Sequence, residues 1–542
     1  MKKQTFGLFI FLAFGLLLFS YQIQEKADMV LVNGKVYTVS VKNPQVQAVA
    51  VRGGKILALG TDEEIKKFIA PSTQILDAGG KLVLPGFIDA HCHIIYGGHS
   101  LAMLDFRNAR SVESIQKQIA AKIKELPEGE AVFGFASFPN TSLFKGLGWP
   151  TKEMLDEVSP NNPVVIRRGG GHAVWVNSMV LKKSNITKDT EAPSGGEIVK
   201  DPETGEPAGI LKEAAQNLLK VWDKGKPKED MERALKHAAS LGLTGLQTSS
   251  SLNEIKILKQ LKEEGKLTLR VYAWLPIGGI DKYIKEGIKR GQGDDMVRSG
   301  FLKVYIDGTI GVRSALLFEA FAEEPGNFGL AQMEEEEFYV LVEKAHANGY
   351  QIGVHAIGDK AVHWVLNAVE RAQKKHGKKG LRHRVEHNTV NLVSDTGRFC
   401  ELGVIASMQP NITGSEAYRV VRLGKERAKR VDMWRTLLDN GVVLAWGTDW
   451  AVSSLNPMYN LYQLVTRFPE QRLTMAEAIK YYTYGPAYAS FEEDIKGTLE
   501  VGKLADMVVL SRDLLTIRPG RILGTKVLYT ILGGKIVYQR QE

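Results

Sequence analysis

The feature that most constrains the fold is a regular alternation of short β-branched runs with helix-length amphipathic stretches. This alternation is typical of a parallel sheet whose strands are joined by crossover helices. Eight such units predict an α/β fold of the (β/α)8 TIM-barrel type. The eight runs are Leu84 to His93, Thr244 to Ser250, Thr268 to Trp274, Phe301 to Asp307, Gln351 to His355, Arg382 to His387, Val404 to Gln409 and Val442 to Asp449.

The gap between the first two runs is far longer than a crossover helix requires. Residues of about 100–225 are therefore expected to form a long α/β insertion after the first strand, and Pro163 to Arg168 has the pattern of a strand within it. With this insertion included, we expect the barrel to occupy residues 85–494.

Both ends of the chain carry hairpin patterns. Met29 to Val39 alternates around an Asn-Gly pair, and Tyr529 to Tyr538 alternates around a Gly-Gly pair. Because an isolated two-stranded hairpin is marginally stable, we expect residues 27–84 and 495–542 to pool their strands in one small β-sandwich.

The first residues have the profile of a secretory signal. Met1-Lys2-Lys3 is followed by the apolar stretch Phe6 to Phe19, which is shorter than the roughly 20 residues of a spanning helix. We therefore predict that residues 1–26 are a signal peptide and that the protein is exported to the periplasm or the outside of the cell. The alternative is an uncleaved N-terminal membrane anchor, since no Ala-x-Ala site follows.

The composition excludes several classes of protein. Hydrophobic residues at 44% and charged residues at 24% are ordinary for a globular chain, which excludes a wholly disordered, collagenous or multi-span membrane protein. The net charge of +9 is spread among acids without a groove-reading or base-stacking motif, so we expect no nucleic-acid partner. Two cysteines, Cys92 and Cys400, cannot build a disulfide scaffold at this size. The expected partner is a small-molecule substrate. The sequence is compatible with a homo-oligomer and does not decide the oligomeric state.

Metal-ligand side chains recur at the ends of the predicted strands. His91 and His93 lie two apart in the first run and so point the same way. His355, His387 and Asp449 end three further runs, and the carboxyl ends of barrel strands meet at one mouth. Imidazole and carboxylate suit zinc and similar ions. Taken singly, each residue has a structural explanation, but jointly they predict a metal site.

The fourth run places Lys303 among apolar residues. An unpaired buried ammonium would cost several kcal/mol or lower its own pKa. One resolution is a neutral amine that reacts with carbon dioxide to give a carbamate bridging two metal ions. The other is a salt bridge to Asp307, which faces the same way along the strand. The residues themselves leave both open.

In combination these stretches resemble the amidohydrolase superfamily, and more narrowly its branch containing N-substituted formamide deformylase. The motifs that carry the resemblance are GFIDAHCH at 86–93, KVYIDG at 303–308, VHAIGD at 354–359, HRVEH at 383–387 and GTD at 447–449. The resemblance implies one or two divalent ions per chain, with zinc expected. It implies that His91 and His93 bind the more buried ion, that His355 and His387 bind the second, that carbamylated Lys303 bridges them, and that Asp449 binds metal and shuttles a proton.

The same resemblance reaches the insertion, where it suggests that His172 and Trp175 line the substrate pocket. A structural role for His172 is the alternative. His383 lies deeper along its strand than His387, and we expect it to be structural. The aromatic residues Phe133 and Phe135 favour apolar or aromatic substituents on the substrate.

The expected reaction is hydrolysis of a non-peptide carbon–nitrogen bond in an amide, formamide or cyclic amide. A metal-bound hydroxide would attack the carbonyl carbon, and Asp449 would return the proton to the departing amine. The same site would also serve ester or lactone hydrolysis or deamination. A non-catalytic exported binding protein is the remaining alternative, and it would need a broken ligand set, which the sequence does not have.

Overall fold

In the computed structural model, most of the predicted signal segment and the predicted substrate residue His172 lie outside the described residues. Among the described helices, none is both long and apolar enough to cross a membrane. The described residues are 25–106, 109, 111–136, 149–168, 173–193, 196–222, 225–311, 313–412 and 414–541.

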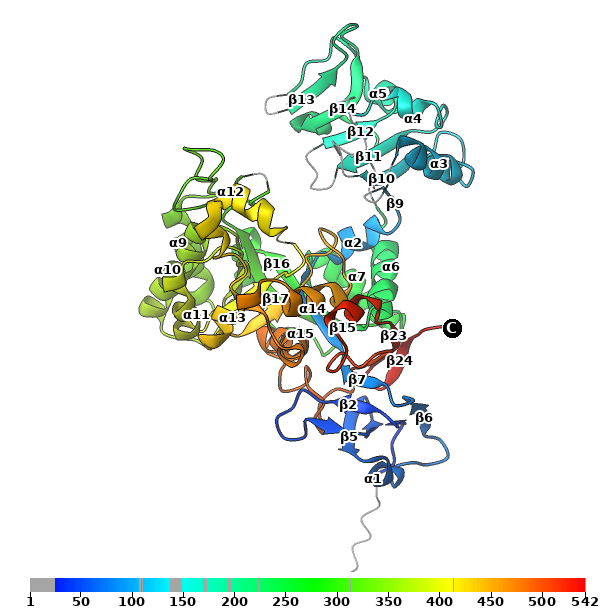
Figure 1. The fold of residues 1–542 in the computed structure, drawn as a ribbon, viewed down its shortest axis with the longest axis vertical. Coiled ribbons are helices and arrows are strands. Elements are labelled where there is room, and N and C mark those ends of the chain that lie inside the picture. The colour runs from blue at the N-terminus through cyan, green and yellow to red at the C-terminus, as the bar shows by residue number, and fades with distance from the viewer. Residues whose placement is uncertain are drawn as a thin grey trace, which may run out of the picture.

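The centre of the molecule is a nearly closed, eight-stranded parallel barrel of the TIM type, as predicted (Figure 1). A parallel bridge between Cys92 and Trp450 brings the first and last strands together. All eight predicted runs overlap a strand. The strands in sheet order are β8 (Phe87–Cys92), β15 (Leu243–Ser249), β16 (Arg270–Pro276), β17 (Val297–Tyr305), β18 (Ile352–Ala356), β19 (Arg384–His387), β20 (Ile405–Met408) and β21 (Leu444–Trp446).

The barrel strands are buried on both faces because helices cover their outer side. Every residue of β8, β18 and β19 is buried, and one apolar core joins strands and helices. Each aliphatic side chain buried in this way contributes about 1.5–3 kcal/mol. The outer helices are α6 (Pro227–Ser240), α7 (Leu252–Glu263), α8 (Ile280–Glu286), α9 (Glu335–Ala347), α10 (Asp359–His376), α11 (Thr396–Leu402), α12 (Glu416–Ala428), α13 (Trp434–Asp439), α14 (Pro457–Thr466) and α15 (Met475–Ala489). Short 3-10 turns are η2 (Ile277–Gly279), η3 (Val393–Asp395), η4 (Pro469–Gln471) and η5 (Pro519–Gly524).

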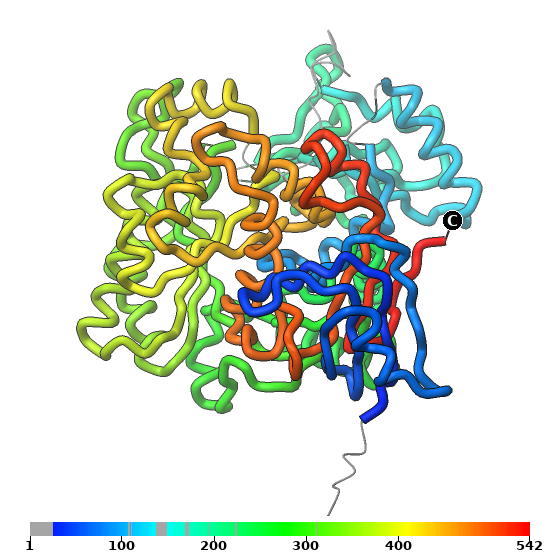
Figure 2. Tube along the Cα trace, turned by 60° about the horizontal axis from the view of Figure 1, so that its bottom comes forward, coloured from blue at the N-terminus to red at the C-terminus, as the bar shows by residue number. Residues whose placement is uncertain are grey.

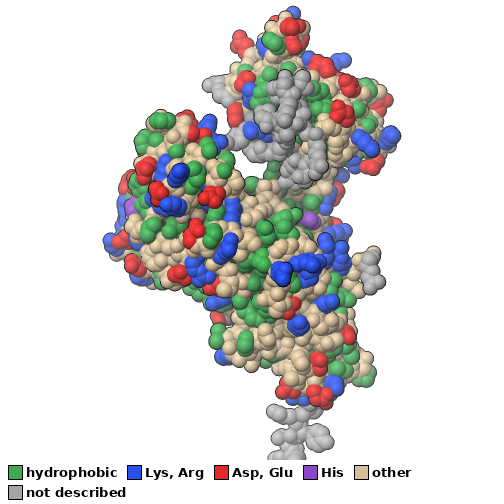
Figure 3. Space-filling model, in the orientation of Figure 1, with side chains coloured by type: hydrophobic (Ala, Val, Ile, Leu, Met, Phe, Trp, Pro, Cys, Tyr) green, Lys and Arg blue, Asp and Glu red, His purple; other side chains and the backbone are tan. Residues whose placement is uncertain are grey.

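The segment between β8 and β15 leaves the barrel through α2 (Ile94–Ser100) and builds a sheet of its own above the barrel in Figure 1. In the space-filling view of Figure 3 this part forms the lobe at the top. Apolar clusters cover both faces of this sheet. Its strands in sheet order are β13 (Gly196–Lys200), β14 (Pro207–Glu213), β12 (Ala173–Val176), β11 (Val164–Arg168), β10 (Val132–Ala136) and β9 (Leu104–Asp105). Its helices are α3 (Val112–Ile123), α4 (Glu153–Asp156), α5 (Ser178–Ser184) and η1 (Ala214–Leu218).

The two ends of the chain form two further sheets, and one of them takes strands from both ends (Figure 2). A shared apolar cluster joins residues such as Leu31 and Val51 to Met507 and Ile531. The first sheet is β5 (Lys55–Gly60), β4 (Ala48–Arg52), β1 (Met29–Val32) and β6 (Gln74–Asp77), beside α1 (Asp62–Lys66). The second sheet is β24 (Lys535–Gln539), β23 (Val527–Leu532), β22 (Met507–Leu510), β7 (Leu82–Pro85), β2 (Lys35–Tyr37) and β3 (Gln45–Val46).

Candidate active site

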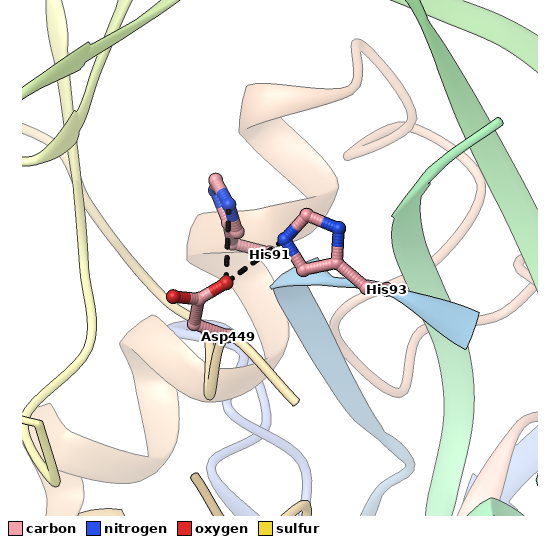
Figure 4. A group of neighbouring side chains, drawn as sticks. All are labelled: His91, His93 and Asp449. Atoms are coloured by element: carbon pink, nitrogen blue, oxygen red, sulfur yellow. Dashed lines mark ion pairs between the residues drawn. The ribbon is translucent and has the colours of Figure 1, made fainter. Parts of the chain in front are cut away.

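The ends of the first and last barrel strands bring together two histidines and a carboxylate (Figure 4). His91 lies in β8, His93 follows it at the start of α2, and Asp449 follows β21. The Oδ1 atom of Asp449 is 3.0 Å from Nε2 of His93 and 3.6 Å from Nε2 of His91. One ligand atom from each residue lies within 4.8 Å of the others.

Lys303 of β17 joins this group. Its Nζ is 3.2 Å from Nε2 of His91, and its side chain is buried, with the amine over the rings of Trp274 and Tyr305. Burial lowers the pKa of Lys303 to about 8. Among the described residues no ion pair joins it to Asp307, whose carboxylate instead accepts backbone N–H groups from the loops after the strands.

The two remaining predicted ligands lie side by side beyond His91. The ring centroids of His355 and His387 are 4.4 Å apart, and that of His387 is 5.0 Å from that of His91. Burial lowers the pKa of His355 to about 4 and lowers the pKa values of His91 and His387 well below the usual range. The rings are therefore neutral at neutral pH, which is the form that offers a lone pair to a metal.

Two of these residues adopt a backbone conformation that is rare outside glycine. His387 has φ 73° and Asp449 has φ 55°, both in the left-handed region. Such positions cost about 1–3 kcal/mol each and concentrate at functional sites, where the surrounding fold holds them.

Glu386 is a residue of the site that the sequence analysis missed. Its Oε2 is 2.6 Å from Nδ1 of His91, and both side chains are fully buried. The other Glu386 oxygen is paired with Arg384 at 2.7 Å. Since Nδ1 of His91 donates to this carboxylate, Nε2 is left with its lone pair toward Asp449 and Lys303. The signal was available in the motif HRVEH, where two ionisable residues alternate within a buried strand.

Asp89 was also missed. Its carboxylate accepts the hydroxyl of Thr448 at 2.6 Å and the backbone N–H of His91 at 2.9 Å. Burial raises the pKa of Asp89 to about 7. These bonds connect β8 to the loop that carries Asp449, so Asp89 positions the two sides of the site against each other.

Trp175, predicted to contact substrate, lies in the insertion. It is fully buried in an apolar cluster, and its indole N–H donates to the carbonyl of Thr151 at 2.8 Å. Packing accounts for this placement, and its predicted substrate contact stays a prediction.

A cavity of about 300 Å³ opens beside His93. It is bordered by Tyr96 of α2, Asp230 of α6, Ser249 of β15 and Glu254 of α7, among others. Phe135 of the insertion packs edge-on against Tyr96. Apart from His93, these lining residues were not predicted, because the side chains come from segments far apart in the sequence.

The donor set fits a metal ion. Ligand atoms about 2.0–2.2 Å from one zinc ion lie roughly 3–3.5 Å from each other, and the Asp449 oxygen lies 3.0 and 3.6 Å from the two histidine nitrogens. Neutral imidazoles and a carboxylate are also the ligand types that zinc and similar ions take.

Comparison with known proteins identifies the group to which the chain belongs. The model described as "Amidohydrolase family" matches residues 74–538. The chain belongs to the amidohydrolase family. It is 31% identical to Protein LONG AFTER FAR-RED 3 of Arabidopsis thaliana over 94% of this chain and 92% of that protein. It is 27% identical to N-substituted formamide deformylase of Arthrobacter pascens over 95% of this chain and 99% of that enzyme.

A solved structure extends this similarity to the fold. The uncharacterized metal-dependent hydrolase of Pyrococcus horikoshii has a TM-score of 0.74 and 29% identity, covering 91% of this amidohydrolase and 99% of its own chain. The protein is accordingly a metal-dependent hydrolytic enzyme with a candidate metal site at the mouth of its barrel.

Proposed function

We propose that this amidohydrolase hydrolyses a non-peptide carbon–nitrogen bond in a small amide, formamide or cyclic amide. The observation that carries the proposal is the convergence of donors from separate strand ends on one mouth. The similarity over nearly the whole chain to an enzyme named for N-substituted formamides supports this bond type.

We infer a site for one or two divalent ions, with zinc as the expected metal. His91 and His93 would hold one ion, His355 and His387 the second, and carbamylated Lys303 would bridge them, with Asp449 as a further ligand. The buried amine of Lys303, with its pKa lowered to about 8, favours carbamylation because the neutral amine is the reactive form. A bound divalent ion polarises a substrate carbonyl and lowers the pKa of a coordinated water toward about 7.

Asp449 is the proposed proton carrier. Burial raises its pKa, but the hydrogen bond from His93 and the neighbouring side chains of His91 and Lys303 hold the pKa of this carboxyl below its usual value. It is therefore a carboxylate at neutral pH and accepts a proton on its oxygen. That proton then passes to the substrate nitrogen, because an amine leaves only when it is protonated.

The cavity beside His93 gives the substrate its place. Its volume of about 300 Å³ suits a small ligand. Tyr96, backed by Phe135, offers an aromatic edge to a substituent on the nitrogen. We propose that N-substituted amides with apolar or aromatic groups bind here.

The test is metal analysis of the purified enzyme together with a screen of formamides, cyclic amides, esters, lactones and amino-heterocycles. We expect one to two equivalents of divalent metal and turnover of at least one amide class. Turnover of esters, lactones or amino-heterocycles with no amide cleaved would overturn the proposed bond type. An Asp449→Asn variant as active as the parent would overturn the proton carrier.

We also propose that residues 1–26 direct export, with an uncleaved anchor as the alternative, and that the two end-derived sheets form a single β-sandwich. N-terminal sequencing of protein recovered from the periplasm or medium is the test of export. Recovery from the cytoplasm with Met1 intact would contradict it.

A further inference from the structure

Helix α12 contains two buried arginines whose surroundings differ. Arg427 is satisfied: its Nε donates to the carbonyl of Leu423 at 2.8 Å, and its terminal nitrogens donate to the carbonyls of Glu319 and Ala320 at 2.7 and 2.6 Å. Arg419 is even less accessible, with 2% of its surface exposed. Its Nε donates weakly to the carbonyl of Ser415 at 3.4 Å. In the part of the chain that the structure describes, its two terminal nitrogens have no acceptor.

The charge of Arg419 is also poorly compensated. No carboxylate of the described residues lies within ion-pair distance of it. Burial lowers its pKa to about 10, and the more distant charges of Asp432, Glu416 and Glu470 only partly offset this. A guanidinium with so little access to water and no ion-paired carboxylate is costly, so an acceptor on a bound ligand would stabilise it.

An aromatic ring orients the group. The guanidinium carbon of Arg419 lies 3.7 Å from the ring centroid of Phe468, and that of Arg467 lies 4.8 Å from the same centroid. Arg467 also donates to the carbonyl of Pro410 at 3.1 Å. Stacking on an aromatic face holds a guanidinium while leaving its N–H edge available for planar acceptors.

Arg419 and Arg467 border one cavity of about 520 Å³ between α12 and η4. The cavity is lined by Arg419, Lys425, Lys429, Arg467, Phe468 and the two acids Glu416 and Glu470, among others. Its volume lies in the range of small-molecule pockets, about 300–1,000 Å³. None of the proposed metal ligands lines it, so it is separate from the candidate active site.

We propose that this cavity binds a small anionic molecule through a carboxylate or phosphate group held by Arg419 and Arg467. The oxygens of such a group match the planar fork of guanidinium donors and form charge-assisted hydrogen bonds with it. Phe468 forms the apolar side of the site, and an anion there supplies the acceptor that Arg419 lacks.

The experiment is calorimetric titration of the metal-loaded enzyme with sodium phosphate and, separately, with sodium citrate, at constant ionic strength. Arg419→Met removes the guanidinium donors and keeps an apolar side chain of similar length. Arg422→Met is the matched control, because Arg422 lies on the same helix, pairs with Glu323 and does not line the cavity. We expect saturable binding of at least one probe, at least tenfold weaker in Arg419→Met and within twofold of the parent in Arg422→Met.

The stability of the ligand-free variant is the second measurement. Because Arg419→Met removes a poorly compensated buried charge, its thermal midpoint without added anion should equal or exceed that of the parent. A midpoint far below the parent, or failure to fold, would mean that Arg419 already has its partner within the protein and would overturn the proposal. So would absence of saturable binding of both probes, equal affinity in Arg419→Met, or equal loss in Arg422→Met.

Discussion

Two groups of buried histidines in the same barrel have different surroundings. In the pair His346 and His383, each ring nitrogen has a partner: the carbonyl of Gly377 at 2.9 Å, the other imidazole at 2.9 Å, and the backbone N–H of Ile352 at 3.2 Å. Two neutral rings satisfy this chain of bonds completely. At the mouth, Nε2 of His91 faces the Lys303 amine and the Asp449 carboxylate.

The difference shows that burial alone does not distinguish the proposed metal ligands from structural histidines. His383 and His91 are equally buried, with 2% and 0% of their surfaces exposed, yet His383 meets one imidazole and a backbone N–H, whereas His91 meets two carboxylates and an amine. Buried charged groups are stable when they are paired or coordinate a metal, so the ionisable groups around His91 are suited to hold a cation.

Removal of metal by a chelator should abolish activity, by more than about a thousandfold, because the mouth depends on the ion for its chemistry. It should also lower the thermal midpoint, since an ion bound only to the folded state stabilises it by mass action. Activity assays and thermal unfolding before and after dialysis measure both effects, and zinc should restore them. Full activity in the metal-free protein would contradict the assignment of the mouth as a metal site.

Asp449→Asn should lower kcat by about a thousandfold, since general acid–base groups contribute about 10²–10⁴-fold. The metal content should stay close to that of the parent. Asp439→Asn, at an exposed carboxylate on α13, is the control and should change neither quantity. Steady-state kinetics on a substrate from the screen, with metal analysis of each variant, makes the comparison.

Glu386→Gln should weaken metal binding about 10- to 100-fold, the usual cost of removing a carboxylate that orients a ligating histidine. Competition with a chromogenic chelator measures the affinity. Glu370→Gln, at an ion-paired carboxylate on the outer helix α10, is the matched control. If both variants hold metal like the parent, Glu386 has only a packing role.

The smallest effect concerns His383. Burial lowers its pKa to about 3 in the folded protein, below the usual value of 6.5, so the folded state binds fewer protons than the unfolded state. Its contribution to stability is present above pH 6.5 and is lost as the pH falls toward 3. At pH 5 this loss is about 2 kcal/mol.

His383→Gln, which does not titrate, should therefore show a shallower fall in unfolding free energy between pH 7 and pH 5 than the parent. Denaturant unfolding at each pH measures it. The metal content of this variant should be unchanged, and a loss of metal would erase the distinction between the two groups of histidines.

Sequence patterns predicted the barrel well because its signals are local. Each run of β-branched residues fixed one strand, and the donors at the strand ends followed from the fold class. Strand β17 begins at Val297, four residues before the predicted Phe301. Polar Ser299 interrupts the apolar pattern in this extra segment, so the pattern did not predict the start of the strand. In the structure its hydroxyl donates to the carbonyls of Lys289 and Gln292, which allows a polar residue there.

The residues that sequence reasoning missed depend on distant contacts. Glu386 meets His91 across 295 positions, and Asp89 meets Thr448 across 359. In neither pair does a periodic pattern or a turn signature in the sequence indicate that the two residues are in contact. The cavity at Arg419 was missed for the same reason, because Arg467 and Phe468 reach it from the turn between α14 and η4.

The site straddles the seam where the barrel closes, with both histidines of Figure 4 on one side and the aspartate on the other. A growing polypeptide therefore carries His91 and His93 for several hundred residues before Asp449 exists. Contacts of such long range form late, because loop closure must precede them. We therefore expect the proposed site to hold an ion fully only after the barrel has closed, and a chain truncated before β21 should bind metal less tightly because the strand that closes the mouth is missing.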